Sequence, residues 1–418
     1  MLLIAAFISL VFLYSLVSRR LEKTAITAPI LFTAAGALLA IFPEAATELV
    51  LDRKGLLLVA ELGLVMTLFT DASRVSPGML KGHTNLPVRL LSIGMLLTIV
   101  LGALCAMVVF RTISWWEAGI LGAILAPTDA GLGQVIVNSE LVPQRIRQAL
   151  NVEAGLNDGL AVPFMMFFIA LAVAQETHTG GAVFVRFVVE QLGYGALIGL
   201  VIGLLGGWLL GLSRRKKWMA EPLAQLGVVT LPLACVLASD AVGASMFIAA
   251  FVAGLATQVG FNEVGKHSVE FAEDWGQLFN LFVFFLFGLV VSRVWTHFSL
   301  VVVIYGVLSL TLIRMVPVAI ALTGTHLSRP TVLFMGWFGP RGLASIVLAL
   351  VYLEGELNLP AESIIKQAVM ATVLFSIFAH GITALVGTRR YANAITPLSS
   401  SAPEHETVAP AVEYVEDA

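Results

Sequence analysis

Seven ionisable residues within long apolar stretches of the sequence are candidates to carry chemistry: Glu61, Asp71, Asp129, Glu153, Asp158, Arg314 and Arg341. Ionisable side chains are costly at membrane depth, and there they usually mark ion or proton pathways. A carboxylate taken out of water holds its proton more tightly, and a bound metal cation competes with that proton. Two such carboxylates, exposed alternately to each side of a membrane, would exchange cations for protons.

The stretch Ala126-Pro127-Thr128-Asp129 combines a helix breaker with oxygen ligands. Proline interrupts the helical hydrogen bonds and leaves backbone carbonyls free. The Asp129 carboxylate and the Thr128 carbonyl are hard oxygen ligands that suit a small cation. Aspartate is also a common helix N-cap, and the spacing favours neither role over the other.

The segment from Asn151 to Gly159 places three polar groups in one apolar stretch. Glu153 and Asn157 are four residues apart and share a helix face, and Asp158 is the residue after Asn157. This pattern indicates a helix whose polar face is turned away from lipid. The alternative is a solvated segment at the cytoplasmic membrane surface.

Arg341, in Gly339-Pro340-Arg341-Gly342, stays protonated and needs a partner inside a membrane. We expect that partner to be Glu153, because pairing spares both groups an uncompensated burial. The alternative partners are the carbonyls freed by the break in its own helix.

Glu61 and Arg314 are weaker candidates. Asp71 ends an apolar run, where it either lines a cytoplasmic vestibule or marks the membrane edge. Cys105 and Cys235 lie in apolar runs and are expected to be small buried hydrophobes. The sequence has no zinc-ligand spacing and no hydrolase or nucleotide motif. We therefore expect no cofactor and no enzymatic activity.

The amino-acid composition indicates whether water or lipid surrounds the folded chain. Of the 418 residues, 58% are apolar and 12% are charged, against about 25% charged in soluble domains. The mean hydropathy is +0.94. These values exclude a soluble enzyme, a nucleic-acid binder and a disordered protein, and they predict an all-α polytopic membrane protein surrounded by lipid. A helix needs roughly 20 apolar residues to span a bilayer.

Breaks in the apolar pattern predict thirteen transmembrane helices. They fall near residues 1–18, 25–42, 55–72, 86–110, 114–138, 147–174, 182–212, 221–238, 243–259, 269–292, 298–324, 331–352 and 362–388.

The distribution of basic residues supports this count and predicts the orientation. With the N-terminus outside, 16 of the 24 Lys and Arg residues fall in cytoplasmic loops and 6 in outer loops. Positive charge favours the cytoplasmic side. The prediction is a multi-pass protein of the cell (inner) membrane with its C-terminus in the cytoplasm.

The chain divides into a transmembrane domain, 1–390, and a polar tail, 391–418, which is expected to be disordered. The spans 114–138 and 331–352 each contain a proline beside a polar or charged residue. Paired interrupted helices of this kind point to the binding site of a secondary transporter.

Three motifs together carry a resemblance to a known family. Ala126-Pro-Thr-Asp129, Glu153-Ala-Gly-Leu-Asn-Asp-Gly159 and Gly339-Pro-Arg-Gly342 occur in order in the expected helices. The chain resembles the monovalent cation:proton antiporters, and within them the NhaP-type sodium/proton antiporters related to animal sodium/proton exchangers.

The resemblance implies an inverted-repeat antiporter fold with two crossed broken helices. Core helices would occupy about 86–174 and 298–388, and the remainder would form the interface of a homodimer. Thr70-Asp71-Ala72 resembles the acid-bearing third helix of the family.

The resemblance also assigns roles to residues. Asp158 would be the main carboxylate for cation and proton, and Asp129 with the Thr128 carbonyl would complete a Na⁺ site. Asn157 would steady Asp129 or the helix break, and Asp71 would contribute at the cytoplasmic funnel.

Glu153 and Arg341 would form a structural ion pair. Ala154 stands where the family commonly has a serine whose hydroxyl joins the cation site, and a water would substitute for it.

The resulting prediction is an antiporter that exchanges Na⁺, or alternatively Li⁺ or K⁺, for H⁺. The Asn157-Asp158 pair is similar to that of the electroneutral class. The alternatives are a K⁺/H⁺ antiporter of the same fold, an organic-anion symporter using the helix N-termini at the breaks, and a membrane-embedded hydrolase or a channel. Acidic residues outnumber basic ones among the candidates, and no nucleophile with a base is apparent. Both observations favour the cation antiporter.

Overall fold

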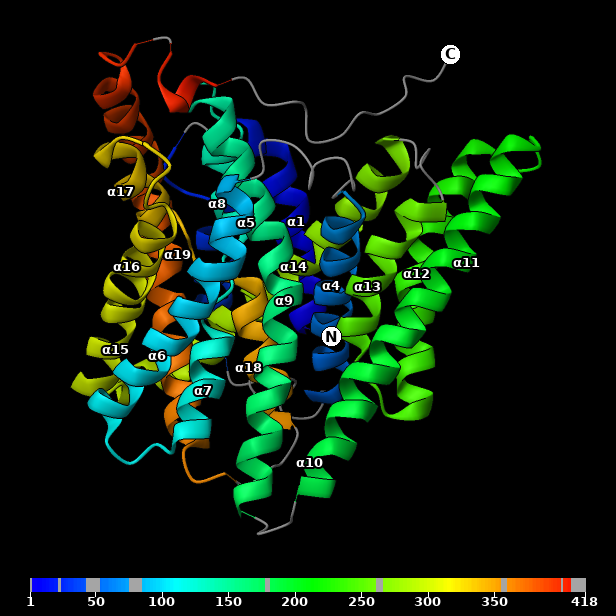
Figure 1. The fold of residues 1–418 in the computed structure, drawn as a ribbon, viewed down its shortest axis with the longest axis horizontal. Coiled ribbons are helices and arrows are strands. Elements are labelled where there is room, and N and C mark those ends of the chain that lie inside the picture. The colour runs from blue at the N-terminus through cyan, green and yellow to red at the C-terminus, as the bar shows by residue number, and fades with distance from the viewer. Residues whose placement is uncertain are drawn as a thin grey trace. The chain divides into compact units, whose positions relative to one another are not determined.

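The computed structural model describes residues 2–21, 24–42, 53–74, 85–176, 181–260, 266–354, 359–399 and 401–406. Within these ranges the regular structure is helical, with no strand (Figure 1). The chain splits into two compact units, and each is described by itself. The first unit comprises 1–60, 85–157 and 280–408, and the second comprises 61–84, 158–279 and 409–418.

The first unit contains both interrupted helices. Its complete helices are α1 (Leu2–Leu21), α2 (Ala28–Leu39), α5 (Asn85–Arg89), a π-helical turn (Leu90–Gly94), α6 (Met95–Phe110), α7 (Trp115–Ile124), α8 (Ala130–Val137), α15 (Leu300–Leu310), α16 (Leu312–Ala321), α17 (Arg329–Trp337), α18 (Leu343–Glu354) and α19 (Glu362–Ile395).

The second unit is built around a pair of closely packed helices. Its complete helices are α10 (Gly181–Val188), a second π-helical turn (Val189–Tyr194), α11 (Gly195–Arg215), α12 (Glu221–Val242) and α13 (Met246–Gly260). Three long helices contribute residues to both units: α4 (Arg53–Ser73), α9 (Gln144–Glu176) and α14 (Lys266–Val294).

The thirteen predicted spans are all present as helices. Among the described residues, nine apolar helices are long enough to cross a membrane, and α2, α13 and α18 are shorter apolar helices. The predicted span 114–138 is α7 followed by α8, and the predicted span 331–352 is α17 followed by α18. The span 298–324 has a further interruption at Thr311, between α15 and α16.

Each of the two proline-containing interruptions follows from its sequence. Helix α7 ends at Ile124 and α8 begins at Ala130, with Asp129 in an extended conformation at its N-cap. Helix α17 ends at Trp337 and α18 begins at Leu343. Proline lacks the amide hydrogen that would continue each helix, so Pro127 and Pro340 lie in the extended connections.

A stripe of glycines explains the tight packing of α11 against α13 in the second unit. Gly199, Gly203 and Gly207 recur every four residues and therefore lie on one face of α11. A Cβ on Gly199 would stand 2.3 Å from the Ala249 carbonyl oxygen, so the two helix backbones touch at this face.

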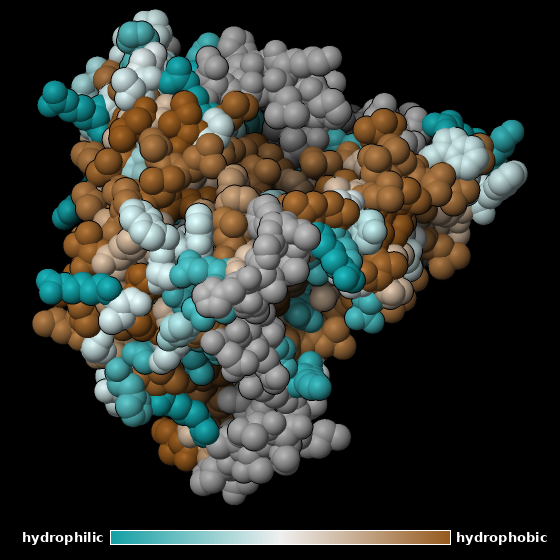
Figure 2. All heavy atoms as spheres, turned by 60° about the horizontal axis from the view of Figure 1, so that its bottom comes forward, coloured by the Kyte–Doolittle hydropathy of each residue, from teal (hydrophilic) through white to brown (hydrophobic). Residues whose placement is uncertain are grey.

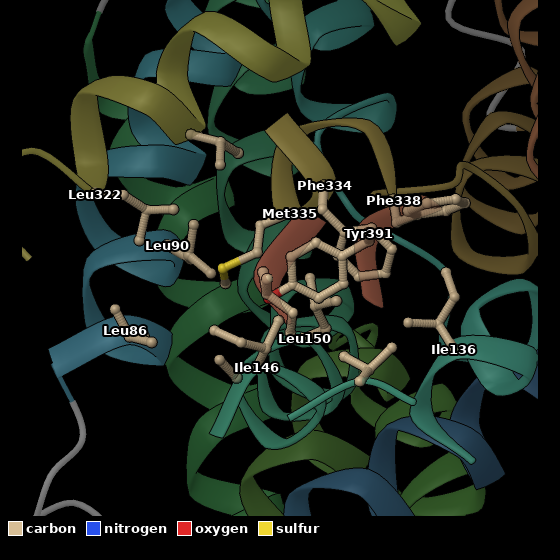
Figure 3. Packing of buried hydrophobic residues seen from close by; sticks show 14 of the residues in the cluster. Leu86, Leu90, Ile136, Ile146, Leu150, Leu322, Phe334, Met335, Phe338 and Tyr391 are labelled. Carbon is tan, nitrogen blue, oxygen red and sulfur yellow. The ribbon is translucent and has the colours of Figure 1, made fainter. Parts of the chain in front are cut away.

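An apolar cluster holds one end of the first unit together (Figure 3). It joins residues of α5, α8, α9, α16, α17 and α19. Phe334 of α17 stacks on Tyr391 of α19, with ring centroids 4.2 Å apart. Met335 and Ile146 are fully buried beside them.

The outward faces of the helices are apolar as well. Large hydrophobic side chains are exposed on α1, α6, α11 and α15, among them Phe12, Val108, Leu205 and Leu300. In the face shown in Figure 2, hydrophobic residues cover much of the described surface. Apolar side chains on the outside as well as inside fit a protein surrounded by lipid.

The tail differs from the sequence expectation up to Glu406. Helix α19 continues to Ile395, Tyr391 is buried, and residues Pro403–His405 form a 3₁₀ turn. The prediction of disorder from 391 did not foresee that Glu404 supplies a buried carboxylate to donors at the start of α17. The remaining part of the predicted tail, 407–418, lies outside the described residues.

The contacts of Glu404 explain this ordering. Its Oε1 accepts hydrogen bonds from the Ser328 backbone N–H at 2.7 Å and from the Thr331 hydroxyl at 2.9 Å. Arg145 donates to the Pro403 carbonyl at 2.5 Å and pairs with Glu406 at 2.6 Å. The turn therefore closes over the first residues of α17.

We predict that acid releases this turn. Burial raises the pKa of Glu404, but the hydrogen bonds from Ser328 and Thr331 outweigh it and hold the pKa below its ordinary value of 4.5. A carboxyl group whose pKa is lowered by folding contributes stability above its unfolded pKa, and loses it as pH falls through the folded value. Hydrogen exchange of residues 396–406, corrected for intrinsic rates, should therefore accelerate below about pH 4.5.

Glu404→Gln should accelerate the same exchange at neutral pH. Glu406→Gln is the matched control, because its partly exposed ion pair contributes little. Equal protection in Glu404→Gln and the unsubstituted protein would contradict the role of this carboxylate.

Candidate functional site

The two interrupted helices meet at Asp129. Its backbone N–H donates to the Pro340 carbonyl at 2.7 Å. Its carboxylate accepts the Leu132 N–H on Oδ1 at 2.8 Å and the Leu343 N–H on Oδ2 at 2.6 Å. One buried carboxylate thus caps the N-termini of both α8 and α18. Of the two roles left open for Asp129, the structure shows the capping role, extended to a second helix.

Gly342 makes this double cap possible. A Cβ on Gly342 would stand 2.1 Å from Asp129 Oδ2, closer than any side chain tolerates. The motif Gly339-Pro340-Arg341-Gly342 therefore ends in glycine because the carboxylate of the other broken helix occupies that space.

Arg341 binds the first interruption on its α7 side. Its guanidinium, fully buried, donates to the Pro127 carbonyl at 3.0 Å and also to the Ala126 carbonyl. These carbonyls lie just after α7, which ends at Ile124 and whose dipole places partial negative charge near that end. Each interruption is thus bound by a charged side chain from the other.

The expected Glu153–Arg341 ion pair is wrong. Glu153 pairs with Arg314 of α16 instead, through two hydrogen bonds of 2.5 and 2.9 Å between groups that are 3% exposed. The physical reason is that Arg341 is used by the freed carbonyls of the other broken helix. Gly339 leaves room for Arg314, because a Cβ there would stand 2.2 Å from Arg314 Nε.

Asn157 and Thr128 join α9 to the first interruption. Asn157 donates its side-chain N–H to the Thr128 hydroxyl at 2.7 Å, and both residues are buried. Beside them lies a cavity of about 10 Å³, lined by Thr128, Asp129, Glu153, Ala154 and other residues. Its size is of the order that a single water needs.

Asp158 and Asp71 belong to the second unit. Asp158 is buried at 5% exposure and follows Asn157 directly on α9. Asp71 is half-buried near the end of α4, three residues before Arg74, which pairs with Glu273. The first unit thus brings together Asp129, Thr128, Asn157, Glu153, Ala154 and Arg341, while Asp158 and Asp71 are described in the other unit.

Several residues that hold the interruptions were missed from the sequence. The Ser345 hydroxyl donates to the Ile124 carbonyl at 2.7 Å, and Ser376 and His380 of α19 bind the second interruption. Serine is too common in membrane helices to be singled out. Glu117 was recognisable, because Ser114-Trp-Trp-Glu117 is a capping box, and its carboxylate also accepts the Ala361 N–H at 2.6 Å.

A second, apolar cavity lies elsewhere in the first unit. It has a volume of about 470 Å³ and is lined almost entirely by apolar residues of α4, α14, α18 and α19. Neither Asp129 nor Glu153 lines it.

We predict that Glu153 is energetically coupled to Arg314 and much less to Arg341. Removing one partner of a buried pair typically costs about 3–5 kcal/mol, because the other charge is left uncompensated. Glu153→Gln and Arg314→Gln should each lower the thermal unfolding temperature strongly. The double variant should lower it by less than the sum of the two single decreases.

The control is a second double-mutant cycle, in which Glu153→Gln is combined with Arg341→Gln. Because Arg341 binds carbonyls, the decrease in stability caused by Arg341→Gln should add to the decrease caused by Glu153→Gln, with little coupling energy. Strong coupling of Glu153 to Arg341, with none to Arg314, would restore the pairing expected from the sequence.

Comparison with known proteins adds independent information. A sequence profile described as the transmembrane sodium/hydrogen exchanger matches residues 5–386. A Na⁺/H⁺ antiporter of Schizosaccharomyces pombe is 26% identical over 291 residues, covering 65% of this chain and 60% of the relative. The K⁺/H⁺ antiporter NhaP of Alkalimonas amylolytica is 26% identical over 329 residues, covering 78% of this chain and 55% of the relative.

The chain therefore spans somewhat more than half the length of these two curated relatives. Among solved structures, the sodium proton antiporter MjNhaP1 from Methanocaldococcus jannaschii at pH 8 has a TM-score of 0.69. The match is 22% identical in sequence and covers 91% of this chain and 99% of the other, so the two share a fold. With the profile matching nearly its whole length, this multi-span membrane protein belongs to the transmembrane sodium/hydrogen exchanger family.

Proposed function

We propose that this protein is a secondary active antiporter that exchanges a monovalent cation, Na⁺ in the first instance, for H⁺. The observation that carries the proposal is the state of Asp129. Among the described residues, no basic side chain forms an ion pair with it, whereas Glu153 is neutralised by Arg314. A buried carboxylate without a fixed counter-charge suits a mobile cation or a proton.

The proposed mechanism is competition for carboxylates. Asp158 is the main cation- and proton-binding group, and Asp129 with the Thr128 carbonyl completes the Na⁺ site. Binding of either a cation or a proton neutralises the carboxylates, and alternating access to the two sides then exchanges one for the other. No resident cofactor and no catalytic group is needed.

The other residues have supporting roles in this proposal. Asn157 holds Thr128, and Asp71 contributes at the cytoplasmic funnel. Glu153 keeps the interruptions in place by pairing with Arg314. Arg341 does so by binding the carbonyls that follow α7. The small cavity beside Ala154 offers space for a water in place of the serine hydroxyl common in the family.

Potassium is the alternative cation. The relative from Alkalimonas amylolytica is named as a K⁺/H⁺ antiporter and covers more of this chain than the Na⁺/H⁺ antiporter of Schizosaccharomyces pombe does. The Asn157-Asp158 pair supports electroneutral exchange, one cation for one proton. We propose the same reaction class for either cation.

We base the proposed location and orientation on the distribution of charged residues. The excess of basic residues in one set of loops supports a cell-membrane protein with its N-terminus outside and its C-terminus in the cytoplasm. We further propose a homodimer, formed by the helices outside the broken-helix core.

We predict that Asp158→Asn and Asp129→Asn abolish exchange. In everted vesicles or proteoliposomes, adding Na⁺, Li⁺ or K⁺ should dissipate an imposed pH gradient with the unsubstituted protein. An amide can neither take up a proton nor supply a negative ligand, so both variants should fall to the background of empty vesicles.

Asp240→Asn is the matched control, because this carboxylate is exposed near the end of α12. It should retain activity. Full exchange by both Asp158→Asn and Asp129→Asn would show that the site is wrong. Ion flux without any counter-flow of protons, in the unsubstituted protein, would indicate a channel.

A further inference from the structure

His380 lies on α19 within the first unit and faces the second interruption. The ring is 2% exposed, and its Nε2 lies 2.8 Å from the Trp337 carbonyl, the last residue of α17. Its Nδ1 lies 3.1 Å from the Ser376 hydroxyl one turn earlier on α19. A histidine deep in an apolar helix is costly unless its ring nitrogens have partners, and here both do.

Ser376 extends this contact to the other side of the interruption. Its hydroxyl oxygen accepts the Arg341 backbone N–H at 2.6 Å, two residues before α18 begins. The pair from α19 therefore binds the end of α17 through Trp337 and the approach to α18 through Arg341. Between these two points lie the residues that break the helix, Phe338 to Pro340.

The Trp337 carbonyl determines what Nε2 does in this contact. The Trp337 carbonyl can only accept, so Nε2 carries a hydrogen. The Ser376 oxygen accepts from Arg341, which leaves its own hydrogen to donate to Nδ1. Nδ1 lies 3.1 Å from the Ser376 hydroxyl and 3.0 Å from the Ser376 backbone carbonyl, so both of its neighbours belong to its own helix.

The segment held in this way is the one that binds Asp129. Pro340 accepts the Asp129 N–H at 2.7 Å, and Leu343 donates to the Asp129 carboxylate at 2.6 Å. A shift of the backbone between Trp337 and Leu343 would therefore displace the carboxylate. The alternative, that His380 only fills space in the core, accounts neither for the contact of Nε2 with the Trp337 carbonyl nor for the hydrogen bond from the Arg341 N–H to Ser376.

We infer that His380, acting with Ser376, is a positioning residue for the Asp129 carboxylate and so sets the affinity for the transported cation. This inference rests on the proposed antiport. Its distinguishing consequence is a change in apparent KM for the cation, with the maximal rate largely kept, because His380 touches neither the cation nor the proton-exchanging carboxylate.

The test compares four variants in proteoliposomes by Na⁺-dependent dissipation of a pH gradient. His380→Leu removes both ring bonds and should raise the apparent KM for Na⁺ about tenfold, corresponding to about 1.4 kcal/mol. His380→Gln retains an N–H that reaches the Trp337 carbonyl and should restore much of the affinity. Ser376→Ala should raise the KM as His380→Leu does, and it also serves if His380→Leu fails to fold.

Thr372→Val is the matched control. Thr372 is buried on the same helix one turn before Ser376, and its hydroxyl donates only to the Ala368 carbonyl of its own helix. It should leave the KM unchanged.

The outcomes separate the two proposals. If the unsubstituted protein and Thr372→Val show no exchange with any of the three cations, the proposed antiport fails. If both exchange Na⁺ normally while His380→Leu and Ser376→Ala keep the unsubstituted KM, the positioning role is overturned. A loss of maximal rate at constant KM, unrelieved by His380→Gln, would also overturn it and leave His380 as a packing residue.

Discussion

The structure of the first unit depends on one constraint: helix ends inside a membrane need partners that water cannot supply. Interrupting two helices creates four such ends. Asp129 provides negative charge to the N-termini of α8 and α18, and Arg341 provides positive charge to the C-terminus of α7. His380 donates to the last carbonyl of α17. Each end is thus met by a group of the sign or polarity that the helix dipole favours.

This arrangement explains why a carboxylate is left available. Arg314 neutralises Glu153, and Arg341 is occupied by carbonyls, so neither guanidinium forms an ion pair with Asp129 among the described residues. In the part of the chain that the structure describes, the Asp129 carboxylate accepts hydrogen bonds from the backbone N–H groups of Leu132 and Leu343. Neutralising it with a proton or a cation would weaken its hold on α8 and α18 together. The occupancy of the site and the geometry of the interruptions are therefore linked through one side chain.

Much of this was readable from the sequence, and the failures have physical causes. Proline beside Asp129 and Arg341 predicted both interruptions, since proline cannot continue a helix whatever surrounds it. Arg314 was ranked low because its partner, Glu153, is 161 residues away, and such distant pairings leave no local pattern. His380 and Ser376 were passed over for the same reason: what they bind is backbone in another helix. The tail was misjudged because its polarity suggested solvation, whereas Glu404 meets donors at the start of α17.

We propose that cation and proton compete for the same buried carboxylates. The most direct test measures the apparent KM for Na⁺ in proteoliposomes across the pH range in which the protein is active. Competition predicts that the KM rises as pH falls, approaching about tenfold per pH unit for one proton, while the rate at saturating Na⁺ is preserved. An apparent KM independent of pH would contradict the account.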